Sequence, residues 1–165
     1  MPQMNLDAID MRILTEIQED ASLTNVELAA RVGLSASPCL ARVRALEEAG
    51  IIARRVALLD PLMLGASLSV FIQVTLEKQT ETLLEVFETA MSRFPEVMEC
   101  YLMTGDSDYL LRVVVRDTVA LQHFIIDRLS KTRGVANIRS SFALKQVKYK
   151  TALPLEDLTT PRTRR

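Results

Sequence analysis

The spacing of apolar residues changes near the middle of the chain. Over the first 50 residues apolar side chains recur every three or four positions, which is the period of an amphipathic helix. From residue 67 onward, stretches that alternate between apolar and polar residues lie between helical ones, and such alternation predicts half-buried strands. The change of period predicts two domains and an α+β fold. The expected divisions are a helical domain over 1–53, a connector over 54–66 with a strand at 56–59, a sheet domain over 67–155 and a disordered tail over 156–165.

The helical domain is expected to contain three short helices. The first covers residues 6–19 and has one apolar face. The second begins at Thr24, an N-cap residue with Glu27 in capping-box position, and ends at Gly33. The third covers residues 35–49 and has a proline in its first turn, where the missing N–H is tolerated.

The short connection between the second and third helices predicts a helix-turn-helix of the winged-helix type. The apolar side of the third helix, which we expect to face the core, holds Leu40, Val43 and Leu46. The opposite side holds the small residues Ser37, Pro38, Ala41 and Ala45, with Arg42 and Arg44 on its two flanks. A slender helix edged by arginines fits the major groove of DNA, because small side chains permit close approach to the bases. An ordinary helical hairpin with surface arginines is the alternative.

The second half of the chain predicts the order strand, helix, strand, strand, helix, strand. The expected bounds are 68–76, 82–94, 97–103, 109–115, 118–130 and 135–147. This order builds a four-stranded antiparallel sheet with both helices on one face, the ferredoxin-like motif. The side chains expected on the uncovered face are Phe71, Val97 or Met98, and Phe142 or Leu144. Because an open apolar sheet face normally packs against a second sheet, we expect a homodimer formed through this domain.

Composition narrows the class of protein. With 48% hydrophobic and 25% charged residues the chain has the balance of a globular protein, which excludes a disordered or fibrous one. No apolar run approaches the roughly 20 residues of a membrane span, and the N-terminus lacks a targeting pattern, so we expect a cytoplasmic protein without a membrane partner. Cys39 and Cys100 are expected to be reduced thiols. With one histidine and no Cys/His cluster, we expect no metal site and no cofactor.

The net charge of −1 argues against a protein that coats nucleic acid indiscriminately, but the charge is unevenly distributed. Residues 1–34 hold two basic side chains against six acidic ones. Residues 35–55 hold four arginines against two glutamates, and residues 145–165 hold six basic side chains against two acidic ones. Positive charge is therefore concentrated around the third helix and again near the C-terminus. Arg54 and Arg55, in the connector, could contact the DNA backbone or face solvent.

Three motifs resemble a single family of proteins. They are Leu34–Ile52 (LSASPCLARVRALEEAGII), Gly105–Leu111 (GDSDYLL), and Gly134–Val135 followed by Arg139–Phe142 (RSSF). In this order they are similar to the leucine-responsive regulatory protein and asparagine-synthase regulator (Lrp/AsnC) family, also called feast/famine regulators. The likeness extends from about residue 6 to residue 155. The resemblance implies a bacterial or archaeal transcription regulator, not an enzyme, with a DNA-binding helix-turn-helix and a ferredoxin-like domain that dimerises.

The resemblance also implies partners. Members of the family bind double-stranded DNA, assemble from dimers into larger oligomers, often octamers, and respond to free amino acids bound between the sheet domains of neighbouring dimers. On this basis the candidate DNA-contacting residues are Asn25, Ser35, Ser37, Pro38, Ala41, Arg42, Arg44, Arg54 and Arg55. The chain departs from the family at Arg54–Arg55, where many relatives have Gly-Tyr, and this departure allows additional backbone contacts. It also has Ala41 and Ala45 where relatives often carry basic residues, which implies fewer phosphate contacts from the third helix.

The candidate effector site lies at the acidic turn before the third strand. Gly105 is expected to have a positive φ there, and Asp106 and Asp108 could direct both carboxylates at one cation, such as the ammonium of a free amino acid. Backbone N–H groups and the hydroxyls of Ser140 and Ser141, from the same or a neighbouring subunit, could bind its carboxylate. The full candidate set is Met103, Thr104, Gly105, Asp106, Asp108, Tyr109, Ser140 and Ser141. The residues alone favour a solvated turn whose aspartates cap their own backbone, and the resemblance shifts the balance to an effector site.

Two other functions are compatible with parts of the sequence. An enzyme built on the ferredoxin-like domain would need a reactive group, but His123 has no nucleophile paired with it and the sequence contains no phosphate-binding loop. An oligomer that binds a small molecule and has lost DNA binding is compatible with the acidic residues 1–34. We expect a sequence-specific DNA-binding regulator of transcription whose DNA binding or oligomeric state is modulated by an amino acid.

Overall fold

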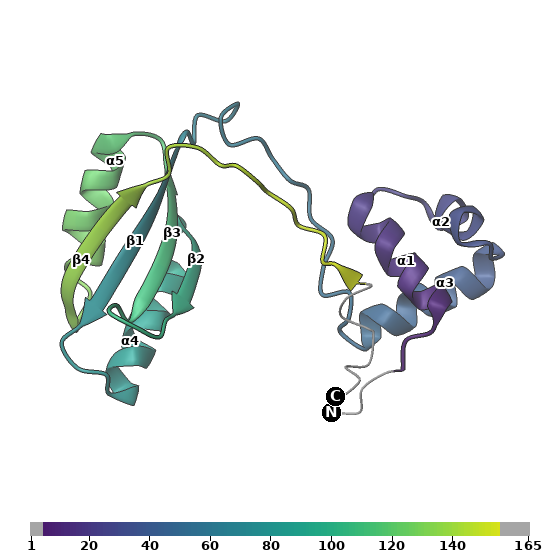
Figure 1. The fold of residues 1–165 in the computed structure, drawn as a ribbon, viewed down its shortest axis with the longest axis horizontal. Coiled ribbons are helices and arrows are strands. Elements are labelled where there is room, and N and C mark those ends of the chain that lie inside the picture. The colour runs from purple at the N-terminus through teal and green to yellow at the C-terminus, as the bar shows by residue number, and fades with distance from the viewer. Residues whose placement is uncertain (1–4, 156–165) are drawn as a thin grey trace, which may run out of the picture. The chain divides into compact units, whose positions relative to one another are not determined.

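The computed structural model describes residues 5–155, and they form two compact units (Figure 1). The helical unit consists of residues 5–58 together with 148–155, and the sheet unit of residues 59–147. The predicted disordered tail over 156–165 lies outside the described residues. By their contacts, residues 148–155 lie with the helical unit, and the two units divide between residues 58 and 59, within the predicted connector. The predicted domain bounds stay a prediction.

Residues 148–155 are held to the first helix, α1 (Ala8–Glu19). The side-chain amide of Gln18 donates to the carbonyl oxygen of Leu153 at 3.4 Å and accepts from the N–H of Leu153 at 2.7 Å. Leu155 packs against the core of the helical unit. Gln18 and Leu153 are 135 positions apart, so no local sequence pattern could indicate this contact.

Three helices lie within residues 5–58 of the helical unit: α1, α2 (Asn25–Val32) and α3 (Ala36–Glu48). The predicted capping box of α2 is confirmed, since Thr24 Oγ1 accepts the N–H of Glu27 and Glu27 Oε2 accepts the N–H of Thr24. Gly33 ends α2 with a φ of 75°, a left-handed conformation that favours glycine. With α3 packed against α2, the predicted helix-turn-helix is confirmed.

The core of the helical unit takes one face from each helix. Its buried side chains are Ile13, Leu14, Ile17, Leu28, Ala29, Val32, Cys39, Val43 and Leu46. On α3 the predicted core residues Val43 and Leu46 are buried, but Cys39 is fully buried in place of Leu40, which is 38% exposed. The prediction that Leu40 faces the core is therefore wrong. Cys39 can take this place because a cysteine thiol behaves as a small hydrophobic group in an apolar interior. Burial also raises the pKa of the Cys39 thiol.

The connector contains no strand among residues 53–67. Residues 56–59, which the sequence predicts as a strand, have no strand assignment, and their apolar side chains are 57–71% exposed. A strand forms when a neighbouring strand pairs with its N–H and C=O groups, and no described segment pairs with this one. The prediction is wrong because the sequence pattern specifies an extended backbone but not a partner.

The sheet unit has the predicted βαββαβ order. Its elements are β1 (Leu68–Leu76), α4 (Glu81–Arg93), β2 (Val97–Leu102), β3 (Tyr109–Val115), α5 (Thr118–His123), the π-helix η1 (Phe124–Leu129) and β4 (Val135–Phe142). The strands lie in the order β2-β3-β1-β4 with all neighbours antiparallel, and the helices cover one face (Figure 1). The predicted α+β, ferredoxin-like fold of this unit is confirmed.

The second helix and the last strand of this unit differ from the prediction. The helix expected over 118–130 is α-helical only to His123 and continues as η1, whose wider turns are rare. The strand expected to reach residue 147 ends at Phe142. Phe142 pairs with Val70, close to where β1 begins, so the chain beyond residue 144 runs past the end of its partner strand.

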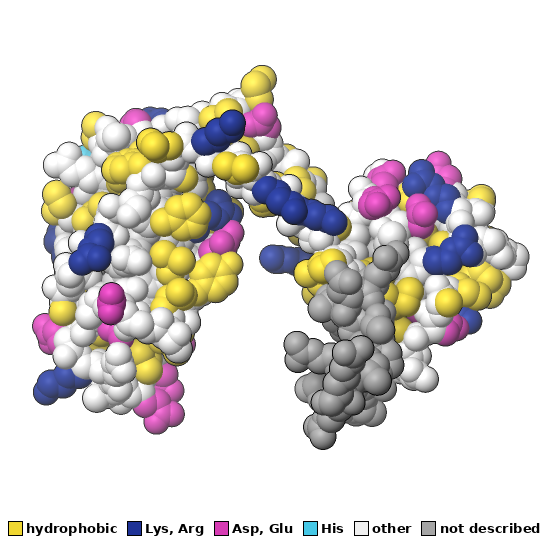
Figure 2. Space-filling view, in the orientation of Figure 1, with side chains coloured by type: hydrophobic (Ala, Val, Ile, Leu, Met, Phe, Trp, Pro, Cys, Tyr) yellow, Lys and Arg dark blue, Asp and Glu magenta, His cyan; other side chains and the backbone are white. Residues whose placement is uncertain are grey.

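The alternation predicted for β1 is confirmed. Val70, Ile72 and Val74 are fully buried beneath the helices, whereas Phe71 lies on the open face of the sheet and is 37% exposed. Cross-strand pairing places Arg112 of β3 opposite Phe71 on this same face. Figure 2 shows hydrophobic side chains gathered on the open face over β3 and β2.

The other side chains predicted on the open face are distributed differently. Phe142 pairs with Val70, whose side chain points toward the helices, so Phe142 shares that side of the sheet and the prediction for it is wrong. Val97 packs against the core, while Met98, at the register shift of β2, is 56% exposed. Leu144 lies beyond β4 and is fully exposed. The face to which a strand residue points depends on register, which a single strand pattern does not supply.

Candidate functional site

The outward surface of α3 is slender. The exposed candidate residues at its start and along it are Ser35, Ser37, Pro38, Ala41 and Arg44. Ser35 is the N-cap residue and makes no side-chain capping hydrogen bond. At 100° per residue Arg44 falls on the side of α3 that faces away from the buried stripe, and it has no ion-pair partner in the part of the chain that the structure describes. The helix therefore presents small side chains and one free guanidinium.

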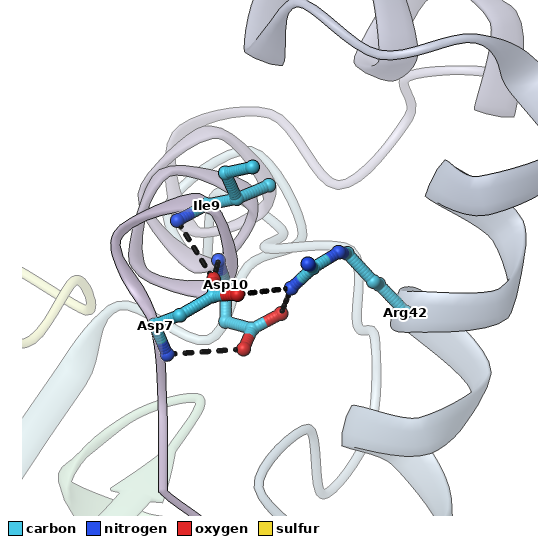
Figure 3. A network of polar contacts seen from close by, with 4 residues as sticks. All are labelled: Asp7, Ile9, Asp10 and Arg42. Atoms are coloured by element: carbon cyan, nitrogen blue, oxygen red, sulfur yellow. Dashed lines mark hydrogen bonds and ion pairs between the residues drawn. The ribbon is translucent and has the colours of Figure 1, made fainter.

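Arg42 has different surroundings from Arg44. Its Nη1 lies 2.7 Å from Asp7 Oδ2 and 2.7 Å from Asp10 Oδ1, both at the start of α1 (Figure 3). The side chain is 34% exposed. The N–H of Asp10 and the guanidinium of Arg42 hold the pKa of Asp7 below its usual value. Of the two arginines that the sequence places on the flanks of the helix, Arg42 is thus ion-paired within the helical unit.

Three further candidates for DNA contact lie around α3. The side-chain amide of Asn25 donates to the carbonyl oxygen of Ala36 at 2.7 Å and so joins the start of α2 to the start of α3, while its Oδ1 is buried without a hydrogen-bond partner among residues 5–155. Arg55 is ion-paired with Glu47 of α3 at 3.1 Å. Arg54 is exposed and has no ion-pair partner within the described range. Contact of these residues with DNA stays a prediction.

The acidic turn between β2 and β3 holds two carboxylates in opposite environments. Asp106 is exposed, whereas Asp108 is 5% exposed and accepts hydrogen bonds from the N–H of Leu76, at 2.7 Å, and from the amide of Gln79. The register of β1 and β4 shifts at Leu76, and Asp108 supplies the acceptor that this N–H needs. The prediction that both carboxylates converge on one cation is therefore wrong for this protomer.

The rest of the turn is closed by backbone contacts. Gly105 has the predicted positive φ, 127°, and the N–H of Met103 donates to the carbonyl of Asp108 at 2.8 Å. Tyr109 is fully buried, and its hydroxyl donates to Glu88 Oε1 at 2.8 Å. Burial, together with Glu88, raises the pKa of Tyr109. The turn residues Met103, Thr104 and Gly105 are exposed, whereas Tyr109 is buried in the core beneath the turn.

A polar hollow of about 270 Å³ lies beside Asp106 on the open face of the sheet. Its lining residues are Gln73, Thr75, Asp106, Ser107, Asn137 and Arg139. One carboxylate and one guanidinium share this hollow with two side-chain amides. A small zwitterion needs this set of partners, an anion for its ammonium and a cation for its carboxylate.

The sequence-based set for this site contains only one of the lining residues, Asp106. Ser140 and Ser141 do not line the hollow, since they pair with Ile72 and Phe71 farther along β1. The sequence reasoning missed Arg139 because its place beside the turn depends on the register between β4 and β1. Two sequence signals could have indicated part of the lining: the alternation of β1, which assigns its polar residues to the open face, and the family motifs that contain Ser107 and Arg139.

Within residues 5–155 no helix is long and apolar enough to cross a membrane. No group of three or more His, Cys, Asp or Glu side chains in this part of the chain is arranged to hold a metal ion. Cys39 and Cys100 are free thiols.

Both units match models of known domain families. Residues 6–53 match a winged helix-turn-helix DNA-binding model, and residues 69–153 match the Lrp/AsnC ligand binding domain. The chain belongs to the Lrp/AsnC family of transcriptional regulators. It is therefore a DNA-binding regulator with a ligand-binding domain, and not an enzyme. The three motifs at 34–52, 105–111 and 134–142 all lie inside the matched ranges.

Relatives of this Lrp/AsnC regulator are similar over nearly the whole chain. It is 48% identical to the Bkd operon transcriptional regulator of Pseudomonas aeruginosa, over 91% of this chain and 98% of that protein. It is 42% identical to the leucine-responsive regulatory protein of Escherichia coli, over 94% of each chain. A solved structure of a transcriptional regulator from Neisseria meningitidis in complex with L-Met has a TM-score of 0.89 at 43% identity, covering 93% of this chain and 99% of that one.

Proposed function

We propose that this Lrp/AsnC regulator contacts DNA with the outward face of α3 and that a free amino acid, bound in the sheet unit, changes its DNA affinity or its assembly. The observation that carries the first part is the exposed strip of small residues beside an unpaired guanidinium, that of Arg44. The second part is supported by the polar hollow at Asp106 and by the L-Met bound to the similar regulator from Neisseria meningitidis.

The proposed DNA contacts come from α3 and from the segments beside it. They are Asn25, Ser35, Ser37, Pro38, Ala41, Arg44, Arg54 and Arg55. Small side chains let the helix enter the major groove, where Arg44 can reach a guanine or a phosphate, and Arg54 in the connector can reach the backbone. Arg42, which the sequence places in the same set, already has two carboxylate partners, one of them buried, whereas Arg55 pairs only with the exposed Glu47 and can exchange it for a phosphate.

Titration against DNA over a range of salt concentrations tests this assignment. The probe is a labelled duplex that the protein itself selects from random-sequence DNA, and binding is followed by fluorescence anisotropy. We expect affinity to fall steeply as salt rises, and Arg44→Ala to weaken binding and to flatten the slope of log affinity against log salt by about 0.9 for each phosphate that the variant no longer neutralises. Arg93→Ala, at the end of α4 in the sheet unit, is the matched control and should bind as the parent protein does. Unchanged affinity in Arg44→Ala would contradict the proposed contact of Arg44 with DNA.

We propose that the amino acid binds in the hollow beside Asp106. The Asp106 carboxylate accepts hydrogen bonds from the ammonium, and the Arg139 guanidinium holds the carboxylate of the ligand with two parallel hydrogen bonds. Met103, Thr104 and Gly105 supply the backbone of the turn, while Asp108 and Tyr109 hold it in place from within the sheet unit. Ser140 and Ser141 act, in this proposal, from a neighbouring protomer.

Calorimetric titration with the common amino acids, beginning with L-Met, tests the site. We expect Asp106→Asn to abolish the heat of amino-acid binding, because the ammonium of the ligand loses its charged partner. The affinity for DNA in the absence of amino acid should stay unchanged. Glu85→Gln, an exposed carboxylate on α4, is the matched control and should keep full binding. Amino-acid binding that survives in Asp106→Asn would place the effector elsewhere.

We propose that protomers pair through the open face of the sheet and that dimers assemble further, as an octamer. Repeating α3 around such an assembly multiplies modest contacts into a high overall affinity for DNA with repeated half-sites. The free amino acid is the one small molecule this function requires. A regulator that contacts DNA and responds to the pool of free amino acids works in the cytoplasm, where we place this protein.

A further inference from the structure

Asp7 and Asp10 form a capping box of two acids at the start of α1. Asp7 is the N-cap residue, and its Oδ1 accepts the N–H of Asp10 at 2.8 Å, while Asp10 Oδ2 accepts the N–H of Asp7 at 3.1 Å. A capping box ordinarily joins serine or threonine to glutamate or glutamine, so it carries at most one negative charge. Here two carboxylates lie together, and like charges at close range disfavour each other. The arrangement is favourable only with a cation beside it.

The guanidinium of Arg42 is that cation. Its Nη1 donates to one oxygen of each carboxylate (Figure 3). Asp10 is 5% exposed, so its charge is largely removed from water and depends on Arg42 and on the positive end of the α1 dipole. No other cation of the described residues forms an ion pair with Asp7 or Asp10.

These partners leave Arg42 poorly suited to bind a phosphate. Two carboxylates and one guanidinium carry a net negative charge, which repels a DNA backbone. A phosphate bound by the remaining N–H groups of Arg42 would lie beside these two carboxylates, and moving Nη1 away to avoid them would leave Asp10 buried without its ionic partner, which is strongly unfavourable.

The same contacts fix α3 in the helical unit. The buried stripe of α3 packs in the core, but apolar packing by itself is non-directional and permits a helix to rotate or slide by small amounts. Arg42 ties the middle of α3 to α1, and Asn25 ties its first residue to α2 through the carbonyl of Ala36. Two polar contacts at different positions along one helix fix its rotation about its own axis. That rotation decides whether Ala41 and Arg44 face outward.

We infer that Arg42, held by Asp7 and Asp10, is a positioning residue for the DNA-reading helix and does not itself contact DNA. The inference rests on the proposal that α3 reads DNA, which Arg44→Ala tests separately.

Asp10→Asn distinguishes the two roles of Arg42 by the sign of its effect. If only charge mattered, removing the Asp10 carboxylate near the DNA would raise the affinity for DNA. If Asp10 holds Arg42 in place, the substitution weakens this ion pair, lets α3 move and lowers the affinity for DNA. We expect Asp10→Asn to bind the selected duplex roughly fivefold more weakly. Glu48→Gln, an exposed carboxylate on the outward side of α3, is the matched control and should bind at least as tightly as the parent protein. Equal or tighter binding by Asp10→Asn overturns the inference.

The salt dependence provides a readout that a loss of stability alone does not change. We expect Arg42→Ala to weaken binding with the slope of log affinity against log salt unchanged, because the same number of phosphates is neutralised. Arg44→Ala should flatten the slope by about 0.9 for each phosphate that Arg44 binds. A slope flattened equally by Arg42→Ala would show that Arg42 contacts DNA, which contradicts the inference. If Arg44→Ala changes nothing while Asp10→Asn weakens binding, Arg42 still positions α3 and the role assigned to Arg44 is what fails.

Asp7→Asn covers the case in which Asp10→Asn does not fold. Asparagine caps a helix as well as aspartate does, so the N-cap is kept while Arg42 retains only one of its two ionic partners. We expect a cooperative melting curve by circular dichroism and a weaker affinity for the same duplex. A folded Asp7→Asn that binds DNA as tightly as the parent protein contradicts the inference.

Discussion

Asp108 accepts two hydrogen bonds at the end of β1, whereas Asp106, two positions earlier, faces solvent beside Arg139. The same contrast separates Arg42, which has two carboxylate partners, from Arg44, which has none among the described residues. At the scale of single residues, the surroundings and not the residue type assign the role. A charged group without an internal partner is available for a ligand, and one with partners holds the fold.

We expect Asp108→Ala to destabilise the sheet unit by about 1–3 kcal/mol, because the N–H of Leu76 loses its buried acceptor. Urea unfolding, followed by circular dichroism, measures this loss as a lower midpoint. Asp106→Ala is the matched control, and its stability should stay within about 0.5 kcal/mol of the parent protein because its carboxylate is exposed. Equal effects of the two substitutions would mean that Asp108 has no special structural role.

At the scale of elements, capping side chains stabilise the beginnings of α1 and α2. α2 has only 8 residues, and a helix of this length is marginal by itself in water, so the free N–H groups of its first turn and the free C=O groups of its last turn need partners. Thr24 and Glu27 supply these partners at the N-terminus. The turn after α2 then depends on Gly33, whose positive φ a residue with a Cβ adopts only with strain.

We expect Thr24→Ala to destabilise the helical unit by about 1 kcal/mol, since the capping hydroxyl is removed. Guanidinium chloride unfolding measures the change. Thr15→Ala is the matched control, because the Thr15 hydroxyl donates to the carbonyl of Met11 within α1 and such a contact contributes little. A cap effect no larger than that of Thr15→Ala would show that tertiary packing alone holds α2.

At the scale of the whole molecule, the sheet has one face covered by helices and one face open. The open face combines Phe71 with the ion pair between Arg112 and Glu99, which is 2.7 Å long. Apolar area of this kind on a monomer marks an interaction surface, and a charged pair among apolar side chains can fix the orientation of the partner. A second copy of the sheet meets both requirements.

For the homodimer that we propose to form through the open face, we expect Phe71→Arg to separate the protomers, because it introduces two unpaired charges into a symmetric interface. Sedimentation velocity at several concentrations measures the change in mass. Val119→Arg introduces the same charge at an exposed position of α5, and should leave the assembly intact. A dimer that persists in Phe71→Arg would exclude the open face as the interface.

The sequence by itself determined the features that depend on neighbouring positions. The capping box at Thr24, the positive φ of Gly105 and the alternation of β1 all follow from residues within a few positions of one another, and each is confirmed. The order of strands and helices followed from the same periodicities. Because backbone periodicity and capping act over one or two turns of chain, a single sequence contains them in full.

Only the tertiary structure decided which distant residues meet. The register of β4 against β1 brings Arg139 to the hollow beside Asp106 and turns Phe142 to the covered side. The packing of α1 on α3 brings Arg42 into ion pairs with Asp7 and Asp10. Residues 56–59 form no strand because no described segment pairs with them. These outcomes depend on contacts between segments far apart along the chain, and the relative placement of such segments is fixed by packing and register, which no local pattern contains.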